Sequence, residues 1–201
     1  MSGSPPEPAP LPPADLARRA PVEIQVAPGE TLHRFYTAAF EPIFYDTSLR
    51  GRLNAPDGRY GVLYVAREAE GAFAETFLRN PGRTQIPTDL LKAKAYVQLR
   101  VLRPLTLVKL AGNGLARVGA TAEVVHGGLP YDTPQAWSSA LFDHPNGYDG
   151  IAYNARHDDE RLCYAIFDRG PPAAEELDRD VDLDQNWFWE LAEPYGVGLP
   201  S

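Results

Sequence analysis

Cysteine is almost absent from this chain of 201 residues, which contains only Cys163. A single cysteine excludes an internal disulfide and a zinc site built from several thiolates, and it is typical of a reducing compartment. No apolar run approaches the about 18 residues that a membrane-spanning helix needs. The first residues show no basic segment followed by an apolar one, as a signal peptide would. We therefore expect a cytoplasmic protein that does not enter a membrane.

Basic residues are also scarce, because 19 Lys and Arg face 27 Asp and Glu and the net charge is −8. The excess of acidic residues lies mainly at the end of the chain, because residues 170–201 contain eight acidic residues and a single base, Arg179. A chain without a basic block is a poor candidate for direct nucleic-acid binding, which needs clustered Lys and Arg. The acidic segment is either a solvated tail or a surface for a basic partner.

Several catalytic and cofactor signatures are missing. Neither GxGxxG nor GxxxxGK[ST] occurs, so the standard nucleotide-binding fingerprints are excluded. There is no GxSxG, and Ser138 and Ser139 fall inside a predicted amphipathic helix, which disfavours a serine hydrolase. The four histidines show no metal-ligand spacing, so we expect no metal site.

Three regions are predicted from composition. Six prolines between Pro5 and Pro13 favour a disordered leader over residues 1–20, with a polyproline partner motif as the alternative. Residues 21–170 are predicted to form the folded domain. Residues 171–201 form an acidic extension, but Trp187, Phe188 and Trp189 are too apolar for a simple tail. We expect these aromatics to pack on the domain or on a second copy of the chain, as a homodimer.

The hydrophobic pattern predicts a mixed α+β fold with mostly antiparallel sheets and flanking helices, because strands and helices do not alternate regularly. Helices are expected at 68–79, at 88–92 and at 133–141, where Thr133 is the predicted N-cap and Pro134 the first helical residue. Residues 156–161 are expected to form a charged loop. Strands are expected at 22–26, 31–36, 62–66, 95–102, 105–108, 150–153 and 162–167.

Four features of the sequence suggest chemistry, and each has a plainer explanation. Arg34 lies in an apolar strand and suits bidentate binding of phosphate or carboxylate, unless it faces solvent. Arg52 follows Gly51 in a loop where backbone can approach an anion. Glu75, considered with Tyr64, is flanked by apolar residues and could stabilise a developing cation, or it is simply an exposed helical glutamate. His157 and Asp158 are an acid–base pair or part of a solvated turn.

Taken in order, these elements resemble the RES domain, which is named for its arginine, glutamate and serine. The resemblance covers roughly residues 30–169. Its matching stretches are Leu32-His33-Arg34-Phe35, Gly51-Arg52-Leu53-Asn54, Leu63-Tyr64-Val65-Ala66, Ala74-Glu75-Thr76-Phe77-Leu78, Tyr148-Asp149-Gly150-Ile151-Ala152-Tyr153, and Arg156-His157-Asp158 followed by Cys163-Tyr164-Ala165-Ile166-Phe167.

The resemblance implies a fold like that of ADP-ribosyltransferases of the diphtheria-toxin type, with NAD as substrate and no required cofactor. RES members are typically toxins of toxin–antitoxin pairs that cleave the nicotinamide–ribose bond by phosphorolysis or hydrolysis. Some transfer ADP-ribose to a protein. The usual partner is an Xre-like antitoxin that covers the active site.

The resemblance also assigns roles. Glu75 stabilises the oxocarbenium-like ribose, Arg34 and Arg52 bind the pyrophosphate, and Tyr64 offers a flat face to nicotinamide or a hydroxyl near the ribose. We therefore expect Arg34 and Glu75 to face one cleft. Residues expected to contribute to NAD binding near the last strands are Asn154, Arg156 and His157.

One position departs from the family pattern. The family serine falls at Ala155, which has no hydroxyl. Asn154 or His157 substitutes for that serine, or the activity is attenuated. The alternatives to NAD cleavage are ADP-ribosyl transfer to a protein and a RES-like module that binds without catalysis.

Overall fold

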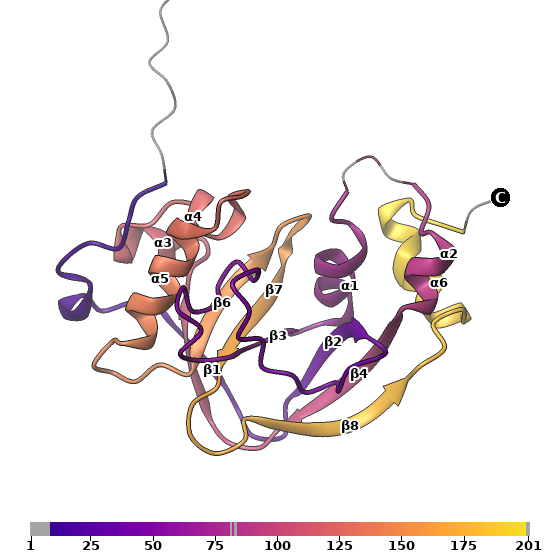
Figure 1. The fold of residues 1–201 in the computed structure, drawn as a ribbon, viewed down its shortest axis with the longest axis horizontal. Helices are drawn as coiled ribbons and strands as arrows, with labels where there is room; N and C mark the ends of the chain where they lie inside the picture. The colour runs from indigo at the N-terminus through magenta and orange to yellow at the C-terminus, as the bar shows by residue number, and fades with distance from the viewer. Residues whose placement is uncertain (1–8, 81, 83, 200–201) are drawn as a thin grey trace, which may run out of the picture.

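The computed structural model describes residues 9–80, 82 and 84–199, and it confirms the mixed α+β class (Figure 1). Eight strands form one sheet in the order β1-β5-β6-β7-β3-β2-β4-β8. All neighbouring pairs are antiparallel except β5 and β6. The strands are β1 Glu23–Val26, β2 Thr31–Thr37, β3 Val62–Ala66, β4 Lys94–Val101, β5 Leu105–Lys109, β6 Gly150–Ala155, β7 Asp158–Phe167 and β8 Ala174–Asp180.

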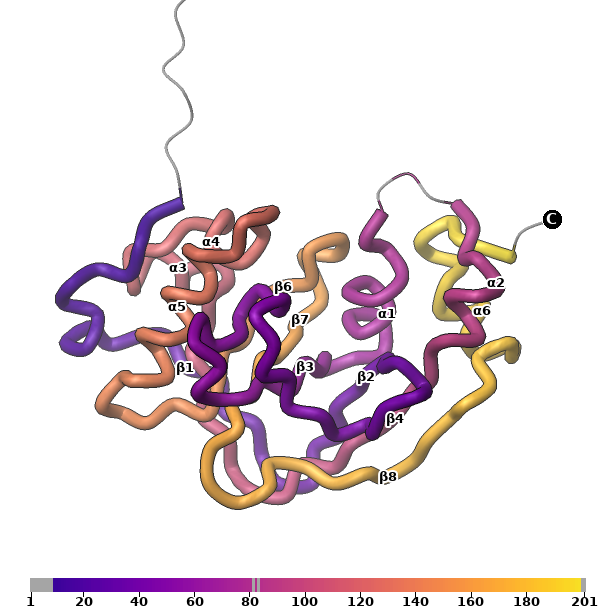
Figure 2. Tube along the Cα trace, in the orientation of Figure 1, coloured from indigo at the N-terminus to yellow at the C-terminus, as the bar shows by residue number. Residues whose placement is uncertain are grey.

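The helices lie in two groups, with the end of the β6–β7 hairpin between them (Figures 1 and 2). One group contains α3, α4 and α5, and the other contains α1, α2 and α6. The α-helices are α1 Ala69–Phe77, α2 Thr88–Lys92, α3 Asn113–Val118, α4 Glu123–His126, α5 Asp132–Phe142 and α6 Asn186–Ala192, and the 3₁₀-helices are η1 Leu16–Arg18 and η2 Glu193–Tyr195.

The sheet buries apolar side chains on both faces, which explains why its central strands read as continuous apolar runs. In β3, Val62 and Ala66 belong to the core on the helix-covered face, while Leu63 and Val65 belong to the core on the opposite face. Side chains alternate along a strand, so each run of apolar residues supplies both cores.

The sheet opens between β2 and β3. These two strands share a single ladder position, His33 with Ala66. By contrast, β2 pairs with β4 at seven positions and β3 pairs with β7 at five. The strands therefore diverge directly after His33, and Arg34 lies at the start of the opening.

The expected disordered leader is wrong for residues 9–20. Leu16 is only 4% exposed. The indole Nε1 of Trp137 donates to the Pro10 carbonyl at 2.7 Å, and the Arg19 guanidinium donates to the Val118 carbonyl at 2.7 Å. Trp137 of the domain thus satisfies a carbonyl of the proline-rich segment, and Arg19 of that segment satisfies a carbonyl of the domain. Residues 1–8 lie outside the described part of the chain.

The expected boundary at residue 170 is also wrong. Strand β8 pairs with β4 and completes one edge of the sheet. Its exposed acidic side chains protect that edge against pairing with another chain. Packing of the C-terminal aromatics on the domain is confirmed, because Phe188 is fully buried against Phe73 and Phe77 of α1.

The predicted helices and strands agree best with the structure where the hydrophobic pattern of the sequence is strong. The helix at 88–92 is confirmed to the residue, and the expected strands are found within a few residues of their predicted ends. Residues 158–161 belong to β7 rather than to a charged loop, and α5 begins at Asp132 with Tyr131 as its N-cap instead of Thr133. None of the described helices has the length and apolar character needed to cross a membrane.

Candidate active site

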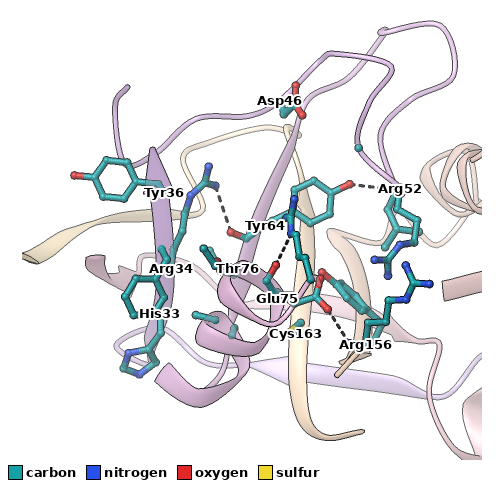
Figure 3. A pocket seen from close by; sticks show the side chains of 18 of the residues that line it. His33, Arg34, Tyr36, Asp46, Arg52, Tyr64, Glu75, Thr76, Arg156 and Cys163 are labelled. Carbon is teal, nitrogen blue, oxygen red and sulfur yellow. Dashed lines mark hydrogen bonds between the residues drawn. The ribbon is translucent and has the colours of Figure 1, made fainter. Parts of the chain in front are cut away.

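A cavity of about 560 Å³ lies where β2 and β3 diverge, and α1, the loop before β3 and the turn after β6 enclose it (Figure 3). Arg34 of β2, Tyr64 of β3 and Glu75 of α1 all line it. The further lining side chains used below are Asp46, Arg50, Arg52, Thr76, Arg79, Lys94, Tyr131, Tyr153, Arg156, His157 and Cys163.

Glu75 is held in the cavity by two elements. Helix α1 buries Phe73 and Phe77 against the sheet, so the intervening Glu75 is left partly exposed on another side of the helix. One carboxylate oxygen of Glu75 accepts a hydrogen bond from the backbone N–H of Arg156, at 2.7 Å. This bond uses one oxygen and leaves the second free to meet a substrate.

Arg34 is a partly buried cation with weak protein contacts. Its Nη1 is 3.3 Å from the Tyr64 carbonyl and 3.5 Å from the Phe44 carbonyl, and its buried Nε has no partner among the described residues. Burial lowers the pKa of Arg34 to about 10, although Asp46 acts in the opposite direction. The guanidinium is still charged at neutral pH, so it is a desolvated cation available to an anionic ligand.

The cavity is strongly cationic although the chain is acidic. Two carboxylates, Asp46 and Glu75, face six basic side chains, which are Arg34, Arg50, Arg52, Arg79, Lys94 and Arg156. None of these six forms an ion pair with a described carboxylate. The arginines that do form ion pairs all lie outside the cavity, at positions 19, 59, 100, 103, 161 and 179. The uncompensated charge favours a ligand with several negative charges.

In the view of Figure 3, Arg34 lies on one side of Glu75, and Arg52 and Arg156 lie together on the other side. Burial lowers the pKa of Lys94, and Arg79 and Arg34 lower it further, which places these three charges together. Burial also lowers the pKa of His157, with Arg156 as the strongest charge acting on it.

The hydroxyl of Tyr64 is already engaged. It donates to Asn54 Oδ1 at 2.8 Å and accepts from the Leu53 N–H at 2.9 Å. Burial raises the pKa of Tyr64 well above its usual value. The hydroxyl therefore positions the loop before β3, and the ring forms part of the cavity wall.

Comparison with known proteins identifies the family. The model of the RES domain matches residues 29–189. The chain belongs to the RES domain family. A chain of the crystal structure of the M. tuberculosis MbcT–MbcA toxin–antitoxin complex has the same fold, with a TM-score of 0.65 and 18% identity over 84% of this chain and 92% of that one. The comparison with curated proteins gave no match.

The RES match confirms the resemblance found in the sequence and extends it through β8 into α6. The cavity described above is called the RES cavity from here on. Six of the predicted site residues line it, and they are Arg34, Arg52, Tyr64, Glu75, Arg156 and His157. The expectation that Arg34 and Glu75 share one cleft is confirmed.

Asn154 does not line the RES cavity, so the structure does not support its predicted part in NAD binding. Its amide Nδ2 donates to the Asp159 carbonyl across the hairpin, at 2.6 Å. Alternation along β6 explains this, because the neighbouring Tyr153 points into the cavity. Ala155 is fully buried, is not among the lining residues and belongs to the same core as Tyr153.

Sequence reasoning missed several residues of the RES cavity, including Asp46, Arg50, Arg79, Lys94 and Tyr131. Arg79 had a usable signal, since it follows Glu75 by one helical turn. Lys94 had none, because only the pairing of β4 with β2 brings it to the cavity. Among the described residues, no group of three His, Cys, Asp or Glu side chains is arranged to hold a metal ion.

Proposed function

We propose that this RES-domain protein binds NAD in the cavity and cleaves the bond between nicotinamide and ribose. One observation carries the proposal: the Glu75 carboxylate stands in a cavity whose basic side chains have no carboxylate partner in the described part of the chain. A dinucleotide brings a pyrophosphate for the arginines and a glycosidic bond for the carboxylate. The volume of about 560 Å³ is within the range of small-molecule sites.

The charged side chains of the cavity suit the cleavage of the nicotinamide–ribose bond. As the C1′–N bond breaks, its electron pair leaves with nicotinamide, which becomes neutral, and positive charge develops on the ribose. Glu75 stabilises this oxocarbenium-like state. Oxygen of water or phosphate then forms the new bond to C1′ and loses its proton to solvent or to a nearby base. Arg34 and Arg52 hold the pyrophosphate, and Arg156 and His157 extend the binding surface.

The test is incubation of the purified protein with NAD, with and without inorganic phosphate, while nicotinamide release is measured. We expect free nicotinamide together with ADP-ribose or its phosphorylated form, and the phosphate dependence identifies the acceptor. ADP-ribose attached to protein would instead support the transferase alternative. An intact protein that binds NAD and releases no nicotinamide would contradict catalysis.

A non-catalytic binding module is the second candidate, and Ala155 favours it. The hydroxyl that the family pattern places there is missing, so a chain with the binding cations intact could have lost turnover. The retained Glu75 and its bond to Arg156 favour the enzyme over the module.

The toxin role is the biological part of the proposal. Membership of the RES family and the shared fold with a toxin–antitoxin complex support it. NAD consumption in the cytoplasm would arrest growth, and an Xre-like antitoxin would bind over the cavity. Induced expression should therefore lower cellular NAD and stop growth, and Glu75→Gln should remove both effects. Growth arrest that persists in Glu75→Gln would count against the role.

A further inference from the structure

Buried polar side chains gather around the loop that carries Arg52. Four polar residues are buried in the described chain, and they are Asn54, Gln135, Ser138 and His144. Three of these four bond to backbone carbonyls between residues 48 and 53. Burying a polar side chain costs free energy unless its hydrogen bonds are made. The three buried polar side chains around this loop therefore indicate that the loop has to be held in one conformation.

Helix α5 holds the loop through two side chains. The Gln135 amide donates to the carbonyls of Leu49 and Gly51, at 2.9 and 3.0 Å. The Ser138 hydroxyl donates to the Leu53 carbonyl at 2.6 Å and lies 2.7 Å from the Tyr60 hydroxyl, which is therefore its donor. The carbonyls on both sides of Arg52 are thereby tied to one rigid helix.

The loop is also held from its other side. Asn54 donates to the Ser48 carbonyl at 2.7 Å, and the Tyr64 hydroxyl bonds both the Asn54 side chain and the Leu53 N–H. The loop packs so closely that a Cβ at Gly51 would lie 2.2 Å from the side-chain oxygen of Asn54. Glycine is required here by space.

The side chain of Arg52 makes few contacts that would hold it in place. One nitrogen donates to the Val125 carbonyl, and the buried Nε has no partner among the described residues. Arg156 lies beside it in Figure 3 and forms no ion pair with a carboxylate of residues 9–80, 82 and 84–199. Arg52 and Arg156 repel each other because both are cations. Their side chains therefore stay close only if the backbone that carries them is held in place.

We propose that Gln135 and Ser138 are positioning residues that hold the Arg52 loop in the geometry needed to bind the anionic part of the dinucleotide. The inference rests on the proposed function, because it assigns Arg52 to substrate binding. The two side chains do not line the cavity and act only through the loop.

The kinetic test uses Gln135→Met and Ser138→Ala. Methionine keeps the length and helix propensity of glutamine but donates no hydrogen bond. We expect KM for NAD to rise roughly three- to tenfold with kcat nearly unchanged, the size expected for one lost interaction with a charged group. Ser139→Ala is the matched control on the same helix, because Ser139 bonds the surface residue Arg59, and its KM should stay at the wild-type value.

A double-mutant cycle separates positioning from general destabilisation. If Gln135 acts through Arg52, Gln135→Met should raise KM in the wild-type background and not in an Arg52→Ala background. Equal effects in both backgrounds would overturn the proposal, because the role of Gln135 would then be independent of Arg52.

Hydrogen exchange provides a readout that needs no NAD. Gln135→Met and Ser138→Ala should speed amide exchange in residues 48–54, while Ser139→Ala should not. Unchanged exchange in both variants would overturn the positioning role. If the wild-type protein neither binds nor cleaves NAD, the proposed function fails, and the exchange result still decides whether α5 holds this loop.

Discussion

The carboxylate of Glu75 on α1 accepts a hydrogen bond from the backbone N–H of Arg156, which follows β6, although 81 positions separate the two residues. The bond joins the carboxylate to the turn that also supplies a cavity cation. It fixes Glu75 without neutralising it, because a backbone amide carries no net charge. A carboxylate that is held and still charged is suited to stabilise a cationic transition state.

We expect Glu75→Gln to lower kcat for NAD cleavage by roughly 100- to 1,000-fold, because glutamine supplies no negative charge to the oxocarbenium-like state. Its side-chain oxygen can still accept the bond from Arg156, so the fold and KM should change little. The measurement is the initial rate of nicotinamide release. Glu70→Gln on the same helix is the control and should keep the wild-type rate, since Glu70 does not line the cavity.

Arg34→Met should weaken NAD binding and stabilise the fold. The partly buried guanidinium has no carboxylate partner among the described residues, and replacing such a cation by an apolar side chain gains roughly 1 kcal/mol in the free energy of unfolding. For a chain of this length that raises Tm by about 2–4 °C.

Calorimetry with NAD and a thermal melt test both effects of Arg34→Met. The matched control is Arg100→Met, because Arg100 forms a surface ion pair with Glu175 outside the cavity. It should leave NAD binding unchanged and shift the free energy of unfolding by at most about 1 kcal/mol. A lower Tm for Arg34→Met would show that its two carbonyl contacts outweigh the cost of burying the charge.

Ala155→Ser should raise kcat for NAD, because it restores the hydroxyl that the family pattern places at this position. Ala155 directly precedes Arg156, whose N–H binds the Glu75 carboxylate. Because Ala155 is buried and does not line the cavity, the new hydroxyl would act through this turn, and we expect a gain in kcat of at most about tenfold with little change in KM.

The matched control for Ala155→Ser is Ala152→Ser on the same strand. Ala152 is equally buried but belongs to the core on the opposite face of the sheet. It should lose stability without any gain in kcat. Unchanged turnover in Ala155→Ser would mean that another group, such as His157, already serves this position.

Thermal stability should fall as the pH decreases from 7 to 5.5. Burial lowers the pKa of His33 below its usual 6.5, against the opposing effect of Glu70 and Glu68, and burial lowers the pKa of His126 and His157 as well. Below about pH 6.5 the unfolded chain therefore binds more protons than the folded one, which destabilises the fold. Well above that pH all three histidines are neutral in both states, and this contribution vanishes.

The pH dependence is measured as Tm against pH, and His33→Gln should flatten the curve between pH 7 and 5.5. Carboxylates act in a separate window, because Arg59 lowers the pKa of Asp143 below its usual 3.8. That group contributes stability which is lost only as the pH falls below about 4. A Tm that is constant or rises from pH 7 to 5.5 would contradict the prediction.

Phe188→Ala should destabilise the fold by about 3–5 kcal/mol, since it removes a fully buried ring from contact with Phe35, Phe73 and Phe77. Urea unfolding measures the change. Leu177→Ala is the control, because Leu177 is 47% exposed on β8, and its effect should stay within about 0.5 kcal/mol. A similarly small effect for Phe188→Ala would mean that α6 is not part of the cooperative domain.

The hydrophobic pattern was sufficient for the fold class and for most strands, and the family resemblance added the expectation that Arg34 and Glu75 face one cleft. Alternation and helical periodicity are local properties, so β2, β3 and α1 could be read from a few residues each. The end segments misled this reasoning. A proline-rich leader looks disordered and an acidic segment looks like an extension of the domain, yet Trp137 anchors Pro10 and β8 pairs with β4 at the edge of the sheet.

Only the tertiary structure decided which polar groups meet. The single ladder position between His33 and Ala66 opens the sheet at Arg34, and strand pairing brings Lys94 to the same cavity. The engagement of the Tyr64 hydroxyl by Asn54, and of Gln135 by the Arg52 loop, depends on contacts between residues up to 86 positions apart. Hydrogen bonds and charge compensation depend on distances in space, and those distances exist only once the chain has folded.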